Sequence, residues 1–382
     1  MQRIICRYIF TFALLFAAVG AASAATFTVT NTNDSGVGSL RQAVLDSNTA
    51  TTPDTIVFDA SFNVPRTITL LSAITINPTN ADATTITGPG ANLLTISGNN
   101  AVGIFNVSAG DSAAFSGMTL IAGNVASGSG AAINSQGSIS VTAVTFSQNA
   151  DPAIDVNGSA TTSTITNCNF TQNPGGGLVI DAGTVTVANS TFTQNAAGAI
   201  NSGGTLTVQN SIFDSNTNSQ GGAISNTGLL TVTDSTFNGN TATSGSATGL
   251  GGGAIYSFSG ITPLAVAISN SSFTANSETG GSGGGGAIRN RSGIMNISGS
   301  SFTNNSAVQG GGAVNNGGVM NLTTSTITGS RSTGLNAAAS GQGEGGGLKN
   351  TFELTLTNSS LTGNGAANSG GGLSSQGSGL LN

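Results

Sequence analysis

One short sequence pattern recurs between residues 138 and 364 and constrains the fold more than any other feature. In its clearest copy, residues 205–216 read TLTVQNSIFDSN and are followed by Gly-Gly-Ala-Ile at 221–224. The copies align on one apolar anchor position, which holds Phe146, Phe170, Phe192, Phe213, Phe237, Phe273, Phe302, Ile327 and Leu361. A fixed period of roughly 20–25 residues with loop insertions predicts a solenoid in which each copy is one coil.

Polar columns beside the anchors have a chemistry that stacked coils explain. The position three residues after the anchor holds Asn149, Asn173, Asn195, Asn216, Asn240, Asn276, Asn305, Ser330 and Asn364. Because stacking places like on like, we expect a Phe stack in the core and a ladder of amide hydrogen bonds at a turn. A second candidate ladder lies three residues before the anchor, at Asn167, Asn189, Asn210, Asp234, Asn270 and Asn358. The Gly pairs before Ile224 and Ile255 are expected to supply positive φ at corners.

Alternation within each copy identifies the kind of solenoid. Apolar Leu206 and Val208 flank Thr207, a two-residue period that is typical of strands, and the repeats show no helical period. We therefore predict an all-β, right-handed, single-stranded parallel β-helix with coils about 4.8 Å apart. Residues 39–46 predict the one convincing helix, with Ser39 as its N-cap and a short apolar face, and we expect it to cover the open end of the first coil.

Three segments divide the chain. Residues 1–24 resemble a signal peptide, with Arg3 and Arg7 before an apolar run and Ala-Ser-Ala at 22–24. Residues 25–121 form the N-terminal cap and irregular first coils, and residues 122–382 the regular β-helix repeats. We expect a secreted or outer-membrane surface location in a bacterium, with no membrane span after signal cleavage. The chain stops before the next anchor, so we also expect a continuation or a partner at the C-terminal coil.

The motifs resemble those of two known groups of surface and secreted proteins. The Gly-Gly-Ala-Ile and Phe-x-x-Asn pairs, as at 221–224 and 237–240, look like the polymorphic outer-membrane protein repeats of chlamydial surface proteins. Residues 26–48 resemble the CSLREA box of secreted bacterial β-helix proteins, although Gly38 replaces its Cys and Gln42 its Glu. The resemblance implies a secreted or surface-displayed passenger, often adhesive, on a pectin-lyase-like superfold that also hosts enzymes.

Few residues could carry catalysis. The absence of His excludes Ser-His and Cys-His nucleophile pairs and His-based metal sites. We assign no catalytic, cofactor-binding or metal-binding residue and expect no cofactor. The acidic candidates for catalysis or Ca²⁺ binding are Asp151, Asp155 and Asp181, of which the last two follow comparable apolar anchors on successive coils. Asp214 and Asp234, about one coil apart, are a second carboxylate pair, but Asp234 falls in an amide column.

Three functions remain open. The leading hypothesis is a non-catalytic, adhesin-like or structural passenger that contacts a host or environmental glycan or protein surface. Its partner would meet the edge that carries the insertions 241–250, 277–282 and 330–343. The net charge of −6 argues against nucleic acid as a partner. The alternatives are a polysaccharide lyase or hydrolase, and an ice- or water-ordering surface built from Thr-x-Thr pairs such as Thr231 and Thr233. Cys168 occupies a column of Ser and is expected to be buried and inert.

Overall fold

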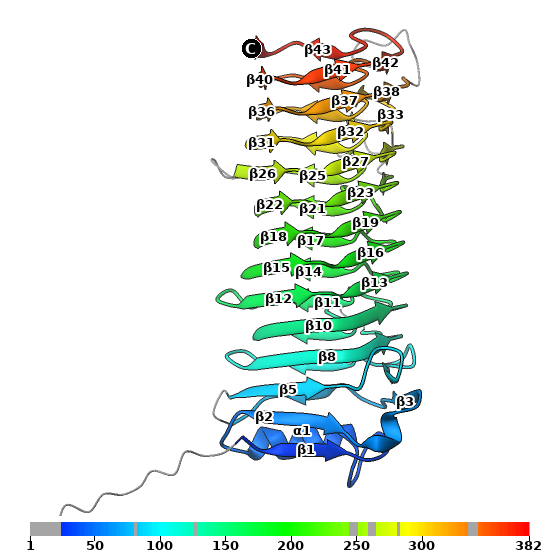
Figure 1. Cartoon of the computed structure of the whole chain (residues 1–382), viewed down its shortest axis with the longest axis vertical. Coiled ribbons are helices and arrows are strands. Elements are labelled where there is room, and N and C mark those ends of the chain that lie inside the picture. The colour runs from blue at the N-terminus through cyan, green and yellow to red at the C-terminus, as the bar shows by residue number, and fades with distance from the viewer. Residues whose placement is uncertain are drawn as a thin grey trace, which may run out of the picture.

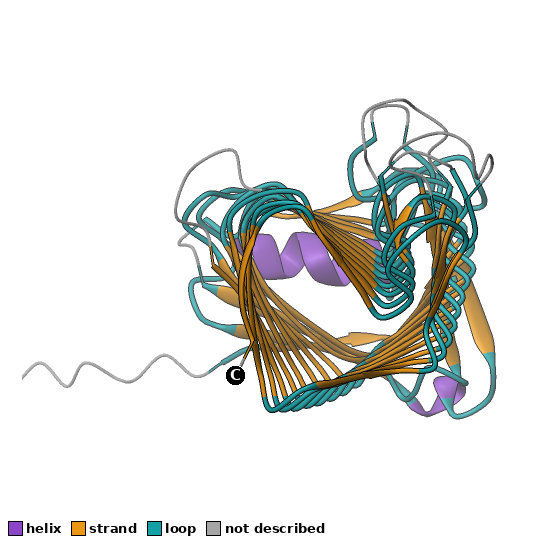
Figure 2. Cartoon of the chain, turned by 90° about the horizontal axis from the view of Figure 1, so that it is seen from above, coloured by secondary structure: helices purple, strands orange, loops and turns teal. Residues whose placement is uncertain are grey.

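The computed structural model describes residues 24–79, 82–125, 128–243, 251–258, 265–280, 283–334 and 343–381. The described residues form one solenoid of parallel strands, with the earliest coils at one end and the last coils at the other (Figure 1). Viewed along its axis, the coils superpose as a tube walled by strands, with turns at the corners (Figure 2). The prediction of an all-β parallel β-helix is confirmed, whereas nearly all of the expected signal peptide lies outside the described residues.

The largest sheet, sheet A, forms two walls of the tube, and every strand pair in it is parallel. The first wall contains β1 (Thr26–Val29), β2 (Asp54–Phe58), β5 (Ala83–Thr87), β8 (Ser112–Ile121), β10 (Ser138–Ser147), β12 (Thr162–Thr166), β15 (Thr184–Ala188), β18 (Thr205–Gln209), β22 (Leu229–Thr233), β26 (Ala265–Ser269), β31 (Ile294–Ser298), β36 (Val319–Thr323), β40 (Glu353–Thr357) and β44 (Ser378–Leu381). The second wall contains β3 (Arg66–Thr69), β6 (Leu94–Ser97), β13 (Asn169–Thr171), β16 (Thr191–Thr193), β19 (Ile212–Asp214), β23 (Thr236–Asn238), β27 (Ser272–Thr274), β32 (Ser301–Thr303), β37 (Thr326–Thr328) and β41 (Ser360–Thr362). The long strands β8 and β10 run through both walls.

A second sheet of short strands, sheet B, completes the tube. It contains β4 (Ile74–Ile76), β7 (Phe105–Val107), β9 (Ile133–Ser135), β11 (Ile154–Val156), β14 (Leu178–Ile180), β17 (Ile200–Ser202), β21 (Ile224–Asn226), β25 (Ile255–Ser257), β30 (Ile288–Asn290), β35 (Val314–Asn316), β39 (Leu348–Asn350) and β43 (Leu373–Ser375).

Two minor sheets lie on the insertion edge. One contains β20 (Thr217–Asn218), β24 (Thr241–Ala242), β28 (Ser277–Glu278), β33 (Ser306–Ala307), β38 (Arg331–Ser332) and β42 (Gly365–Ala366); the other contains β29 (Gly284–Gly285) and β34 (Gly310–Gly311). These pairings place the first residues of the insertions on one edge, as expected. Residues 244–250, 281–282 and 335–342 of the insertions lie outside the described residues.

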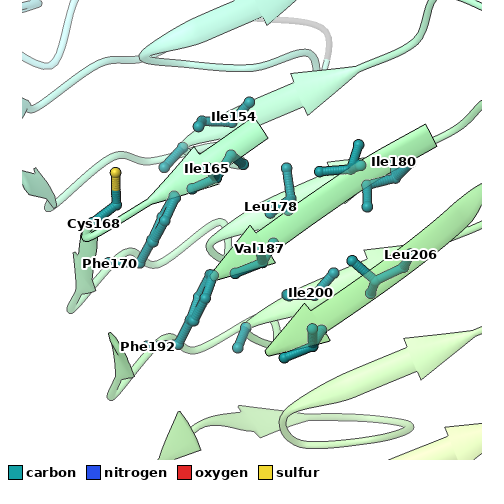
Figure 3. Packing of buried hydrophobic residues seen from close by; sticks show 14 of the residues in the cluster. Ile154, Ile165, Cys168, Phe170, Leu178, Ile180, Val187, Phe192, Ile200 and Leu206 are labelled. Carbon is teal, nitrogen blue, oxygen red and sulfur yellow. The ribbon is translucent and has the colours of Figure 1, made fainter. Parts of the chain in front are cut away.

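The predicted stacks form the interior. From Phe146 to Phe302 the rings lie face to face, with centroids 4.4 to 5.0 Å apart and planes within 10° of parallel. Figure 3 shows Phe170 above Phe192 among the buried aliphatic residues of neighbouring coils. The amide ladder is also present: in each step from Asn149 to Asn305, one side-chain nitrogen donates to the next side-chain oxygen at 2.8–3.1 Å. The Phe column thus buries rings that stack on one another, and the Asn column buries amide groups that hydrogen-bond to one another.

The second predicted ladder is wrong. Asn167, Asn210 and Asp234 have φ of 54°, 47° and 50°, in the left-handed region, and turn the chain between the two walls of sheet A. Asn and Asp are the non-Gly residues that adopt this conformation most readily. They recur in this column because of the backbone angle that the turn requires.

The Gly pairs before Ile224 and Ile255 differ from each other. Gly221 has a φ of 63°, as expected, whereas neither Gly of the second pair has a positive φ. A Cβ on Gly253 would lie 1.9 Å from the carbonyl oxygen of Gly286 in the next coil. Close approach of neighbouring backbones therefore requires Gly at this position.

Cys168 is buried as predicted, and burial raises the pKa of its thiol to about 11. Its backbone N–H donates to Ser190 Oγ at 3.1 Å, and the same bond links Ser190 to Ser211 at 3.2 Å. The column is thus a ladder of hydroxyl-to-backbone bonds that begins at a thiol.

A helix lies at the N-terminal end of the solenoid. Helix α1 (Leu40–Thr49) begins after Ser39, whose Oγ accepts from the Gln42 N–H at 3.2 Å, and it packs against β1, β2 and β4. It is three residues longer than predicted, and a 3₁₀ turn, η1 (Ala60–Phe62), follows β2. Strand β5 was missed by the sequence analysis. Within the described residues, no helix combines the length and apolar character that a membrane span needs.

Candidate functional site

The middle residues of the sheet B strands form a row of outward-facing side chains. In strands such as β9 and β17 the first and last residues are buried and the middle one is half-buried. The sheet register aligns this set, called the sheet B row here: Thr75, Asn106, Asn134, Asp155, Val179, Asn201, Ser225, Tyr256, Arg289, Asn315, Lys349 and Ser374. It combines carboxylate, amide, hydroxyl, phenol, guanidinium and ammonium groups.

The outward face of sheet A is chemically plainer. One aligned row of its first wall contains Ser140, Thr164, Thr186, Thr207, Thr231, Ala267, Asn296, Asn321 and Thr355. Thr, the commonest residue of this row, suits a strand without any further role. Partly buried charges, by contrast, cost free energy, so their concentration on sheet B marks that face as the candidate site.

Asp155 is the most strongly perturbed carboxylate of the sheet B row. It is 5% exposed, its Oδ2 accepts from Asn157 Nδ2 at 3.4 Å, and its Oδ1 is buried without a partner in the described part of the chain. Asn157 Nδ2 also donates to Asn134 Oδ1 at 3.2 Å. Burial, together with the negative charge of Asp181, raises the pKa of Asp155 to about 6.

Three adjoining depressions follow the corner between sheet B and the first wall of sheet A. The largest, about 580 Å³, is lined by Asp111, Asn157 and Ser159 among others. A second of about 510 Å³ shares Ser159 and includes Asp181. A third of about 260 Å³ shares Asp181 and lies over the sheet B row at Val179, Asn201 and Ser225. Polar side chains therefore line a continuous path along several coils.

A turn of unequal length creates the largest depression. Only Gln136 and Gly137 separate β9 from β10, whereas the turns before β8 and β12 are longer. Asp111, at the end of the longer turn before β8, is 5% exposed, and burial raises the pKa of its carboxyl. Its Oδ2 is buried and has no partner among the residues the structure describes. The site thus has a second desolvated carboxyl.

The predicted acidic residues are only partly brought together. Asp181 lies close enough to Asp155 to raise its pKa, yet the register places Asp181 opposite Asn157 and not opposite Asp155. Asp155 and Asp181 were expected to follow comparable anchors, but their positions in the register differ by two residues. Asp151 lies on the preceding turn, where its Oδ2 accepts from the Val125 N–H at 3.0 Å. Its carboxylate therefore stabilises that turn.

The second predicted pair also separates. Asp214 points outward from β19 and accepts from Asn238 Nδ2 at 2.6 Å, whereas Asp234 is an exposed corner residue. The described residues contain no group of three or more His, Cys, Asp or Glu that could hold a metal ion. The sequence analysis missed Asn157 and Tyr256. The signal that could have found Tyr256 is its position, one residue after the Gly-Gly-Ala-Ile anchor, where Ser225 and Arg289 align with it.

Asp155→Asn is expected to remove a pH dependence of stability. Because the folded pKa is near 6 and the ordinary value is 3.8, the folded state binds the proton more tightly. The resulting stabilisation is complete below about pH 4 and is lost as the pH rises through 6, at a cost of roughly 2–3 kcal/mol. We expect Asp155→Asn to raise the free energy of unfolding at pH 7.5 by about this amount and to change it little at pH 4.

Denaturant titrations at both pH values measure this effect. Asp234→Asn is the control, since it changes an exposed carboxylate in a column that otherwise holds Asn, and it should leave the pH dependence unchanged. A variant at position 155 that keeps the wild-type difference between pH 4 and pH 7.5 would show that another group causes it.

The comparisons with known proteins agree with this architecture. Residues 103–273 match the family model described as "Right handed beta helix region". A solved structure described as the catalytic domain of a GH87 alpha-1,3-glucanase in complex with tetrasaccharides has a TM-score of 0.52 and 14% identity, over 91% of this chain and 68% of that chain. A rhamnogalacturonan lyase has a TM-score of 0.36 and 11% identity, over 90% of this chain and 86% of that chain. No curated protein matches the chain. The chain therefore has the fold of a right-handed parallel β-helix.

Proposed function

We propose that this protein is a non-catalytic β-helix that binds an extended glycan along sheet B. One observation carries the proposal: the chemically varied sheet B row, whose members are buried or half-buried, adjoins depressions that continue from coil to coil. Repeat proteins commonly bind through such extended concave surfaces. Amide and hydroxyl groups such as those of Asn201 and Ser225 can both donate to and accept from sugar hydroxyls, and the register repeats them once per coil.

The export and surface display of the chain are part of this proposal. The signal-like segment 1–24 and the resemblance to polymorphic outer-membrane protein repeats and to the CSLREA box support it. The insertion edge remains a second contact surface, but the sheet B row offers the better-defined side chains because much of each insertion lies outside the described residues.

Affinity gel electrophoresis with neutral and acidic polysaccharides tests the proposal. We expect at least one polymer to retard the protein without becoming shorter. Ser225→Tyr fills the 260 Å³ depression and should weaken retardation by roughly ten-fold or more, whereas Thr231→Tyr on the exposed face of sheet A should not. Absence of retardation by every polymer, or equal retardation of both variants, would contradict glycan binding along sheet B.

A second candidate function is glycoside hydrolysis. It is favoured by the neighbouring carboxyls of Asp155 and Asp181, because a carboxyl with a raised pKa, such as that of Asp155, beside a second carboxyl can act as a general acid. Product size in the same incubations decides between the two. Shortening of a polymer that is abolished by Asp155→Asn would identify a hydrolase, and intact polymer with retained binding would support the non-catalytic function.

A further inference from the structure

Positively charged side chains gather in the later part of the sheet B row. Tyr256, Arg289 and Asn315 occupy register-aligned middle positions of β25, β30 and β35. The neighbours of Arg289 on β30 are buried, which turns its own side chain outward. Arg291 lies one residue beyond the end of β30. The two arginines lie close enough for the charge of Arg291 to act on Arg289.

Neutral groups hold both guanidinium groups in place. Arg289 Nη1 donates to Asn315 Oδ1 at 2.5 Å. Arg291 Nη1 donates to Tyr256 Oη at 3.3 Å, and Arg291 Cζ lies 4.7 Å from the ring centroid of Phe258. Tyr256 is only 2% exposed, so these contacts form in a largely desolvated setting. The arrangement orients the arginines but leaves their charges uncompensated.

In the described part of the chain, no carboxylate forms an ion pair with Arg289 or Arg291. The ion pairs found among the described residues are Arg41–Asp34 and Lys349–Glu344. The chain has 14 Asp and Glu residues, and all of them lie within the described ranges, so no acidic side chain of another segment can pair with Arg289 or Arg291. Arg289 Nε is also buried without any hydrogen-bond partner.

A partly buried guanidinium without a counter-charge costs free energy. Burial lowers the pKa of Arg289 to about 10; Tyr256 opposes this shift, and the charge of Arg291 contributes to it. Folding gains nothing from this arrangement, because an apolar or amide side chain would fit the same strand position without that cost. A guanidinium with free N–H groups matches the oxygens of a carboxylate or sulfate, to which it can donate two parallel hydrogen bonds.

We propose that Arg289 and Arg291, with Tyr256 and Asn315 as positioning residues, form a binding site for an oxyanion, either a carboxylate or a sulfate group. The anion supplies the negative charge that the protein itself does not provide at this place. The site lies on the row that the proposed function assigns to the glycan, and to that extent rests on it: the bound polymer carries acidic groups. The missing counter-charge is nevertheless an independent observation, and it is also consistent with the binding of a free anion.

Titration with sodium sulfate and with sodium glucuronate, at ionic strength held constant with sodium chloride, tests the site on the full chain. We expect saturable binding by calorimetry and a rise in the thermal unfolding midpoint of the wild type. Arg289→Gln should weaken binding by roughly ten-fold or more, whereas Arg331→Gln, at an exposed arginine on β38, should bind like the wild type. Without added oxyanion, Arg289→Gln should unfold at the same or a higher temperature than the wild type.

Two results would overturn the proposal. One is an equal response of wild type and Arg289→Gln to both anions. The other is an Arg289→Gln midpoint that lies below the wild type by the same amount with and without anion, which would make Arg289 purely structural. Retardation by acidic but not neutral polymers, lost in Arg289→Gln, would identify the polymer as the source of the anion; binding of small anions alone would identify a free anion. If Ser225→Tyr leaves polymer binding intact while Arg289→Gln abolishes anion binding, the proposed function fails and the anion site stands.

Discussion

Asn240→Ala is expected to lower the free energy of unfolding by about 3–5 kcal/mol. Asn240 is fully buried, and its Oδ1 accepts from both the backbone N–H and Nδ2 of Asn216 at 3.0 Å. Its Nδ2 donates to Asn276 Oδ1 at 3.0 Å and to the Phe213 carbonyl at 2.9 Å. Alanine leaves the buried backbone N–H of Asn216 without this acceptor. It also removes one of the two hydrogen bonds made by Asn216 Nδ2 and one of the two accepted by Asn276 Oδ1. A buried polar group that loses its partner costs about 1–3 kcal/mol before the coil relaxes.

Asn238→Ala is a closely matched control. Asn238 lies two residues away in the same coil but is exposed and donates only to the carboxylate of Asp214. Its loss should change stability by less than about 1 kcal/mol, as for most surface contacts. Denaturant titration followed by circular dichroism compares the two variants. Hydrogen exchange at Asn216 and Asn276 then shows whether the loss is local, because a solenoid can open coil by coil. Equal effects of the two changes would contradict an energetic role for the ladder.

Phe213→Ala is the second large expected loss, about 3–5 kcal/mol. Its ring is fully buried and stacked between Phe192 and Phe237, with centroids 5.0 and 4.7 Å away. Removing the ring leaves a cavity bounded by two rings that the parallel sheet holds at fixed separation, so collapse is limited. The midpoint of thermal or denaturant unfolding measures the loss.

Two other variants make this prediction specific to the stack. Phe213→Leu should cost only about 1–2 kcal/mol, because Leu361 occupies the same column in a later coil. Phe352→Ala should cost little, because that ring is 56% exposed. A Phe213→Ala protein as stable as Phe352→Ala would show that the rings only fill space that neighbouring side chains can take over.

Much of the fold was predictable because stacking turns a sequence column into a contact. The Phe anchors and the Asn that follow them share one position per coil, and each forms an unbroken stack or ladder. The helix after Ser39 was predictable from its cap and apolar face. The column of Asn167 and Asn189 was misread because a sequence column does not say whether its side chain or its backbone angle is under constraint.

The candidate site was much less predictable. Asp155 and Asp181 were identified as acidic residues of successive coils. In the structure Asn157 bonds to Asp155 and lies opposite Asp181, because the register is offset by two residues, which the sequence does not display. The depth of the depression beside Asp111 arises from the short turn at Gln136 and Gly137, and from longer turns before and after it. Arg289 was not predicted as a site residue, because a missing counter-charge is a property of the surroundings and not of the residue.

By itself the sequence determined the solenoid, its repeat and its interior, because apolar and amide columns stabilise only the arrangement that places identical groups above one another. Only the tertiary structure decided which outward residues form a functional face. That depends on how the turns beside sheet B desolvate Asp155 and Arg289, and on which charges from other coils reach them. How close these turns and charges lie to one another depends on turn length and on the register between coils, which a pattern within one coil does not show.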